Sequence, residues 1–100
     1  MVIAIYCFDI DDTICTTIGM DYSNSIPIQK RIGKINALYD AGFIIKFYTA
    51  RGSKTGKDWR ELTEKQLDSW GVRYHELHMA KPFADIYIDD KAVKDSDFEW

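Results

Sequence analysis

Apolar residues along the chain fall into short runs separated by polar, turn-forming segments. The run at residues 2–8 is rich in β-branched and aromatic side chains and does not alternate with polar ones, which is typical of a buried parallel strand. Residues 43–48 and 86–88 predict two further strands, and residues 73–77 predict a short strand or extended segment. We expect the first strand to be central in a mainly parallel sheet.

Two longer segments carry apolar residues at helical spacing. The first helix is expected to begin near Pro27, which suits a first helical turn, with Ser25 as a candidate N-cap, and to end at Gly42. Its predicted buried face consists of Ile32, Ile35, Leu38 and Tyr39. The second helix covers residues 58–70 and ends at Gly71. The order strand, helix, strand predicts a right-handed crossover between parallel strands.

The segments between these elements are polar. Residues 15–25 predict a loop, and residues 52–57 predict a flexible basic loop. The tail is polar apart from Phe98 and Trp100, which we expect to dock either on the core or on a partner.

Length and composition indicate a folded protein. One hundred residues, 46% of them hydrophobic, predict a single domain over residues 1–100. The formal net charge of −3 is not typical of nonspecific binding to nucleic acid or to an anionic membrane. The apolar start lacks a basic region and meets Asp9 after one strand's length, so we expect a cytoplasmic protein without a targeting segment.

The cysteines and histidines do not predict a metal site. Cys7 lies inside the predicted buried strand, so two free thiols are expected rather than a disulfide with Cys15. His75 and His78 have no cysteine partners and are expected to be ordinary loop or strand-end residues.

Three carboxylates follow the first strand within four residues, at Asp9, Asp11 and Asp12. The carboxyl end of a central strand is where open α/β sheets bind ligands. With ~5 Å between carboxylates and an effective dielectric constant of ~20, each pair repels by roughly 3 kcal/mol. Either a proton is retained or a metal ion is bound, and we favour the metal ion. The plain alternative is an N-cap or an acidic turn.

Chemistry-bearing residues also lie at the other predicted strand ends. Thr49 follows the second strand, Lys81 precedes the third, and the third ends in the acidic pair Asp89 and Asp90. Each of these signals is weak alone, and their order along the chain is what gives them meaning.

The pattern of Asp9, Asp11 and Thr13 after an apolar strand resembles the first signature of the haloacid dehalogenase-like (HAD) superfamily, and the residues above match its other three signatures in order. The resemblance implies a three-layer, Rossmann-like α/β fold and a Mg²⁺-dependent phosphohydrolase that works through an aspartyl-phosphate. It implies that Asp9 attacks phosphorus and that Asp11 protonates the leaving group and then deprotonates water. Asp12 and Thr13 are expected to stabilise the turn.

Given this resemblance, charge and side-chain length indicate which groups bind phosphate. Phosphoryl oxygens are expected to be held by the Thr49 hydroxyl and by the neighbouring residues Ala50 and Arg51 with their backbone N–H groups. Lys81 is expected to contribute a positive charge to the same site. Taken singly, Thr49 is better explained as a strand-end hydroxyl and Lys81 as a solvated surface base.

The resemblance also implies a Mg²⁺ site. Asp9, the backbone carbonyl of Asp11 and Asp89 are expected to bind the ion. Asp90 either joins through a water molecule or orients Lys81, and which member of the acidic pair ligates directly is left open.

A cluster of basic residues follows Thr49 in the sequence. It is either a solvated loop and helix start, or a site for a second anionic group of the substrate that also steers phosphate inward. Its members are Arg51, Lys54, Lys57 and Arg60.

The gaps in which HAD enzymes insert cap domains are short loops here. The resemblance therefore implies a capless, open site, and with it either a large substrate or closure by a neighbouring subunit of a homo-oligomer. Within the superfamily the chain is most similar to small capless phosphatase-like proteins of bacterial capsular polysaccharide biosynthesis. This likeness involves residues 49–51, 71–77, 81–82 and 87–92, and it implies a sugar phosphate or a related small metabolite as substrate.

Three other functions are compatible with parts of the pattern. A polynucleotide 3′-phosphatase shares the capless core, but the acidic net charge and the lack of an aromatic, basic strand-binding surface disfavour it. A response-regulator receiver has similar residues in a different chain order. A non-catalytic HAD-like protein that binds phosphate or a partner would normally lack Asp9 or Asp11, and both are present.

Overall fold

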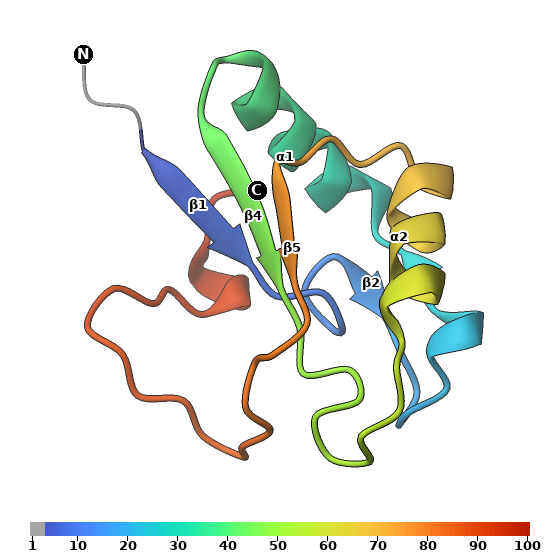
Figure 1. Cartoon of the computed structure of the whole chain (residues 1–100). Coiled ribbons are helices and arrows are strands. Elements are labelled where there is room, and N and C mark those ends of the chain that lie inside the picture. Colours follow the sequence, from blue (N-terminus) through green and yellow to red (C-terminus); the bar gives the residue numbers. More distant parts are fainter. Residues whose placement is uncertain (1–3) are drawn as a thin grey trace.

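A three-stranded parallel sheet is the framework of the computed structural model, which describes residues 4–100 (Figure 1). Its strands are β1 (Ile5–Phe8), β4 (Ile44–Tyr48) and β5 (Glu76–His78), in the order β1-β4-β5. The parallel α/β architecture predicted from the sequence is therefore confirmed. The central position predicted for the first strand is wrong, because β4 is the middle strand and β1 lies at an edge. Residues 2 and 3 of that predicted strand lie outside the described residues.

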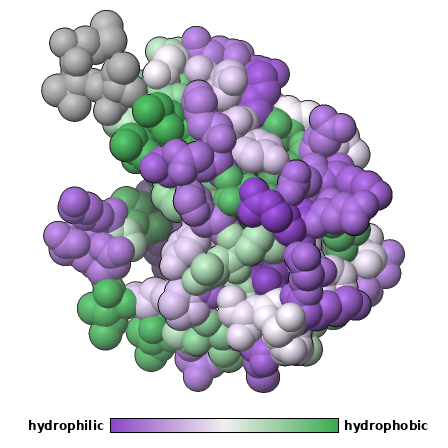
Figure 2. Space-filling view, in the orientation of Figure 1, coloured by the Kyte–Doolittle hydropathy of each residue, from purple (hydrophilic) through white to green (hydrophobic). Residues whose placement is uncertain are grey.

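The third predicted strand, residues 86–88, is also wrong, since the described chain has no strand after β5. The Tyr87 hydroxyl donates to the carbonyl of Pro82 and accepts from the backbone N–H of Ala84, so the segment folds on itself. Ile88 is 96% exposed. Figure 2 shows hydrophobic side chains protruding at the lower left, where Figure 1 draws this segment in orange.

The two predicted helices are present as α1 (Gln29–Asp40) and α2 (Arg60–Ser69). The first begins later than predicted, with Ile28 as its N-cap in place of Ser25. The reason lies in the preceding loop, which forms a small antiparallel pair between β2 (Cys15–Thr16) and β3 (Ile26–Pro27). Short 3₁₀ turns complete the secondary structure at Tyr22–Asn24 and Asp95–Asp97.

Only one face of the sheet is covered by the described residues. The strand register places on that face the side chains of Tyr6, Phe8, Ile45, Phe47 and Leu77. They pack with Ile32 and Ile35 of α1 and with Leu67 of α2. The opposite face carries the 58% exposed side chain of Ile5 and the ion pair between Lys46 and Glu76 (3.3 Å). The three-layer arrangement is therefore corrected to two layers in the described part of the chain.

The tail docks on the core, as one of the two alternatives predicted. The rings of Phe98 and Trp100 lie 5.8 and 5.6 Å from the ring of Phe8. Arg31 of α1 stacks over Trp100 (4.8 Å) and binds Asp95 (2.8 Å), so the tail is fixed to both β1 and α1.

Both cysteines are free, as predicted, but Cys7 is exposed because it lies on the uncovered face of the edge strand. Among residues 4–100, no helix combines the length and the apolar character needed to cross a membrane.

Candidate active site

A tight turn after β1 positions the two aspartates that the sequence singled out. The backbone N–H groups of Thr13 and Ile14 both donate to the carbonyl of Ile10 (3.1 and 2.9 Å), which closes one helical turn. Asp12 adopts a left-handed conformation (φ 60°), and its carboxylate accepts from the backbone N–H of Thr17 (3.2 Å). The predicted turn-stabilising role of Asp12 is confirmed.

Asp9, directly after β1, forms an ion pair with Lys81. Its Oδ1 lies 3.5 Å from Nζ of Lys81, and the two side chains are 35% and 18% exposed. Burial raises the pKa of Asp9 above its ordinary value, and the charge of Lys81 offsets part of that effect. The structure thus brings together two residues that lie 72 positions apart and that the sequence analysis placed in one site.

Lys81 is held in place by its backbone. Its N–H donates to the carbonyl of Thr49 (3.2 Å), and its carbonyl accepts from the hydroxyl of Ser53 (2.7 Å). The ammonium group also lies 4.2 Å from the ring centroid of Tyr87. Hydrogen bonds of the Lys81 backbone therefore connect the chain after β5 to the chain after β4, next to the carboxylate of Asp9.

Asp11 is bound by Arg51. Nη2 of Arg51 lies 2.9 Å from Oδ1 of Asp11 and Nε lies 3.0 Å from Oδ2, while the Thr17 hydroxyl donates to Oδ1 (2.6 Å). Nη1 of Arg51 donates to Thr63 and Gln66 of α2. Arg51 is only 2% exposed, so its side chain positions Asp11 and is not turned toward an external phosphate. This role of Arg51 was not predicted from the sequence.

Thr49 and Ala50 are placed differently from each other. Thr49 is 1% exposed, and its hydroxyl accepts from the backbone N–H of Arg51 (3.1 Å). In this arrangement the hydroxyl stabilises the loop after β4. Ala50 is half-buried and borders a pocket described below.

Among the described residues, those predicted to bind metal do not form a cluster of carboxylates. Asp89 and Asp90 are exposed in the segment that lacks the predicted strand, and no group of three or more metal-ligating side chains occurs in residues 4–100. Asp9 and Asp11 have Lys81 and Arg51 as counter-charges instead. In this arrangement the repulsion between the two aspartates is offset by cationic side chains of the chain itself.

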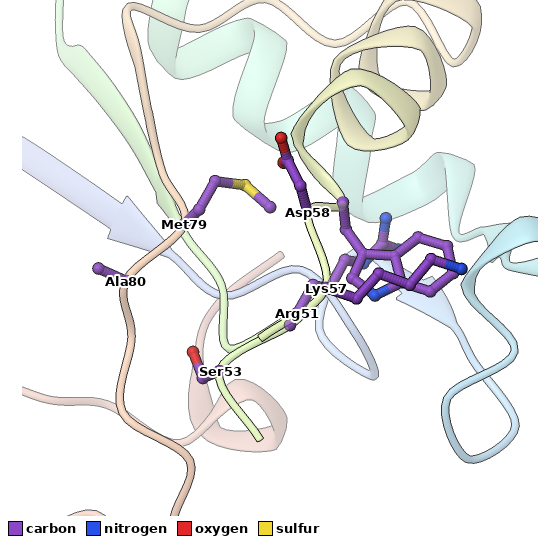
Figure 3. A pocket seen from close by; sticks show the side chains of 8 residues that line it. Arg51, Ser53, Lys57, Asp58, Met79 and Ala80 are labelled. Carbon is purple, nitrogen blue, oxygen red and sulfur yellow. The ribbon is translucent and has the colours of Figure 1, made fainter. Parts of the chain in front are cut away.

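Two hollows that share Gly52, Lys57 and Trp59 in their walls lie beside the loop that follows Arg51. One, of about 320 Å³, lies between Ser53, Met79 and Ala80 on one side and Lys57 and Asp58 on the other (Figure 3). The second, of about 270 Å³, we call the aromatic pocket. Its wall residues are Gly19, Met20, Tyr22, Ala50, Gly52, Lys54, Thr55, Lys57, Trp59 and Phe83.

The predicted cluster of basic residues is divided between two roles. Arg51 is bound to Asp11, and Arg60 donates to the carbonyl of Leu77 (3.1 Å). Lys54 and Lys57 line the aromatic pocket. Only these two remain in a position to meet a second anionic group.

Comparisons with known proteins support the fold. No family model and no curated protein matches the chain. The chain is similar to a crystal structure of an MCSG structural-genomics target from Vibrio cholerae, with a TM-score of 0.82 and 28% sequence identity. The match covers 94% of this chain and 85% of that chain, so the similarity extends over the parallel sheet and both helices.

Proposed function

We propose that this chain is a phosphomonoester hydrolase of the HAD type that forms an aspartyl-phosphate on Asp9. The observation that carries the proposal is the pairing of Asp9 with Lys81 at the end of β1. A partly buried carboxylate with a raised pKa beside a fixed cation is a candidate functional group, because such groups cluster at active sites.

In the proposed reaction, an oxygen of Asp9 attacks phosphorus while the bond to the leaving oxygen breaks. Lys81 lies close enough to Asp9 to contact a phosphoryl oxygen bound there, and its charge stabilises the negative charge that develops. Water then attacks the aspartyl-phosphate, releases inorganic phosphate and restores the carboxylate.

Asp11 is the proposed acid and base for these two steps. Arg51 and Thr17 donate to its oxygens and fix its orientation. For Asp11 to give a proton to the leaving oxygen, at least one of these contacts must open, so the Asp11 side chain moves before the leaving oxygen departs.

The resemblance to HAD enzymes also implies Mg²⁺, a phosphorylated small metabolite such as a sugar phosphate, and a homo-oligomer that closes the open site. These three features belong to the proposal.

The test is phosphate release from sugar phosphates, nucleotides and 3′-phosphorylated oligonucleotides, with and without Mg²⁺. Asp9→Asn is expected to abolish release, whereas Asp68→Asn, which changes an exposed carboxylate on α2, is expected to leave it unchanged. Trapping of a phosphorylated protein in the native chain and not in Asp9→Asn would identify the intermediate. Normal release by Asp9→Asn would contradict the mechanism, and preference for the oligonucleotides would favour the nucleic-acid alternative.

A further inference from the structure

The aromatic pocket is the feature of the surface that the proposed reaction does not explain. Four large apolar or aromatic side chains line it, from three separate segments of the chain: Met20, Tyr22, Trp59 and Phe83. The rings of Tyr22 and Trp59 meet edge to face with centroids 5.0 Å apart. A concave site lined mainly by such side chains, with a few polar groups, is typical of a small-ligand site.

The wall of the aromatic pocket includes residues next to those that hold Lys81 beside Asp9. Ala50, in its wall, directly follows Thr49, whose carbonyl binds the backbone N–H of Lys81 (3.2 Å). Phe83, also in the wall, follows Lys81 by two residues, and two residues span at most about 7 Å of chain. The pocket is thus formed in part by the same two chain segments that hold Lys81, which makes it the candidate site for the leaving group of an ester that reacts at Asp9.

Two cations without carboxylate partners line the same pocket. Nζ of Lys57 lies 4.2 Å from the ring centroid of Trp59, and Nζ of Lys54 lies 5.2 Å from that of Phe83. Within residues 4–100, neither lysine forms an ion pair, although several other lysines and arginines do. Uncompensated positive charge in a concave site attracts a negatively charged ligand group.

We propose that the aromatic pocket binds the leaving group of the phosphate ester, and that this leaving group carries an aromatic ring and a second negative charge. The ring contacts Tyr22, Trp59 and Phe83, and the charge is bound by Lys54 and Lys57. This inference rests on the proposed hydrolase function and names its class of substrate.

A saturated sugar fits the same walls less well. The hydroxyl groups of a sugar ring need hydrogen-bond partners, and a hydroxyl left unpaired against apolar walls lowers affinity. Besides the lysines, the polar side-chain groups in the wall are the Thr55 hydroxyl, which accepts from the backbone N–H of Lys57 (3.3 Å), the Tyr22 hydroxyl and the Trp59 indole N–H. These few polar groups lie among four large apolar or aromatic side chains, which favours an aromatic ring over the sugar that the sequence resemblance implies.

Three synthetic esters separate the ring from the charge. Benzyl, 4-carboxybenzyl and cyclohexylmethyl phosphate all release a primary alcohol and differ in aromaticity or in the added carboxylate. We expect KM to be lowest for 4-carboxybenzyl phosphate, by about tenfold relative to benzyl phosphate, because a charge-assisted contact adds affinity. We expect cyclohexylmethyl phosphate to have the highest KM.

The double variant Lys54→Gln with Lys57→Gln tests the charge. It is expected to raise KM for 4-carboxybenzyl phosphate by about tenfold and to change KM for benzyl phosphate less than about twofold. Lys30→Gln, an exposed lysine on α1 outside the pocket, is the matched control and is expected to change neither value. An equal effect of the double variant on both esters, or equal KM values for all three esters, would overturn the inference.

Binding of the product separates this inference from the hydrolase proposal. 4-(Hydroxymethyl)benzoate needs no turnover, and its binding is followed through the NMR signal of the Trp59 indole N–H. If no ester is hydrolysed but this ligand binds and the double variant loses binding, the hydrolase proposal fails and the pocket assignment stands. If esters are hydrolysed but the ligand does not perturb Trp59, the pocket assignment fails alone.

Discussion

Arg51 binds Asp11 with two parallel contacts, from Nη2 to Oδ1 at 2.9 Å and from Nε to Oδ2 at 3.0 Å. The guanidinium is fully buried, and it also donates to Thr63 and Gln66. One side chain therefore joins the turn after β1, the loop after β4 and the helix α2. The orientation of Asp11 follows from the folded chain and needs no bound ligand.

Replacement of Arg51 is expected to destabilise the fold. Arg51→Ala is expected to lower the free energy of unfolding by about 3–5 kcal/mol, because Asp11, Thr63 and Gln66 lose their donor inside the protein. Arg51→Lys is expected to recover only part of the loss, since an ammonium group cannot make the paired contacts. Urea denaturation measures both values.

The control for Arg51→Ala is Arg73→Ala, which removes a similar paired contact to Asp40 on the surface (2.7 Å). An exposed ion pair contributes about 0–1 kcal/mol, so this variant should remain close to the native chain. Equal losses in the two variants would show that burial of Arg51 has no energetic consequence.

Asp9 is expected to destabilise the fold that carries it. Burial raises its pKa, so the folded chain binds more protons than the unfolded chain between the ordinary value of 3.8 and the higher folded value. Stability contributed by Asp9 is present below that window and is lost as the pH rises through it. Asp9→Asn should therefore melt above the native chain at pH 7 and lose this part of the pH dependence.

Thermal melting of both chains between pH 3 and pH 8 measures the effect, with Asp68→Asn as the control for removing an exposed carboxylate. A melting temperature of Asp9→Asn below that of the native chain at pH 7 would mean that the ion pair with Lys81 outweighs the burial of the carboxylate.

Lys81 is expected to determine the pH below which kcat/KM decreases. Its positive charge lowers the pKa of Asp9, so Lys81→Ala raises that pKa further. Because Asp9 must be ionised to attack, the acid limb of kcat/KM should move to higher pH, and the maximum should fall by about 10²–10³-fold through loss of charge stabilisation. Lys81→Arg keeps the charge and should leave the limb near its native position. If the acid limb of kcat/KM has the same pH position in Lys81→Ala as in the native chain, ionisation of Asp9 does not control that limb.

Local patterns predicted most of the fold. The helix α1 and the strand β4 follow directly from helical spacing and from an apolar run, and Gly42 and Gly71 adopt the left-handed conformations typical of helix ends (φ 97° and 74°). Strand pairing depends on residues far apart in the sequence. The edge position of β1 and the loop at residues 82–88 could therefore not be derived from their apolar character.

The candidate site could likewise be predicted from the sequence only in part. Asp9 and Lys81 were assigned to one site from the sequence, and their side chains do pair. Only a proton or a metal ion was predicted to offset the repulsion between the aspartates, because the contact of Arg51 with Asp11 joins residues 40 positions apart. A signal was present in α2, where the polar residue Gln66 lies on the buried face and binds Arg51.

The loop between Arg51 and Trp59 gives the last prediction, because it forms a wall of both hollows. Gly52 has φ 83°, and a Cβ there would overlap the carbonyl oxygen of Lys57. Gly52→Ala must therefore displace the backbone that carries Lys57, in addition to the left-handed strain of about 1–2 kcal/mol. Gly56→Ala has the same strain (φ 77°) but an open space around its Cβ, which makes it the matched control. We expect only Gly52→Ala to abolish the response of the Trp59 indole signal to 4-(hydroxymethyl)benzoate and to lower the free energy of unfolding by more than its control does. If both variants bind this ligand like the native chain, the loop conformation is not what forms the aromatic pocket.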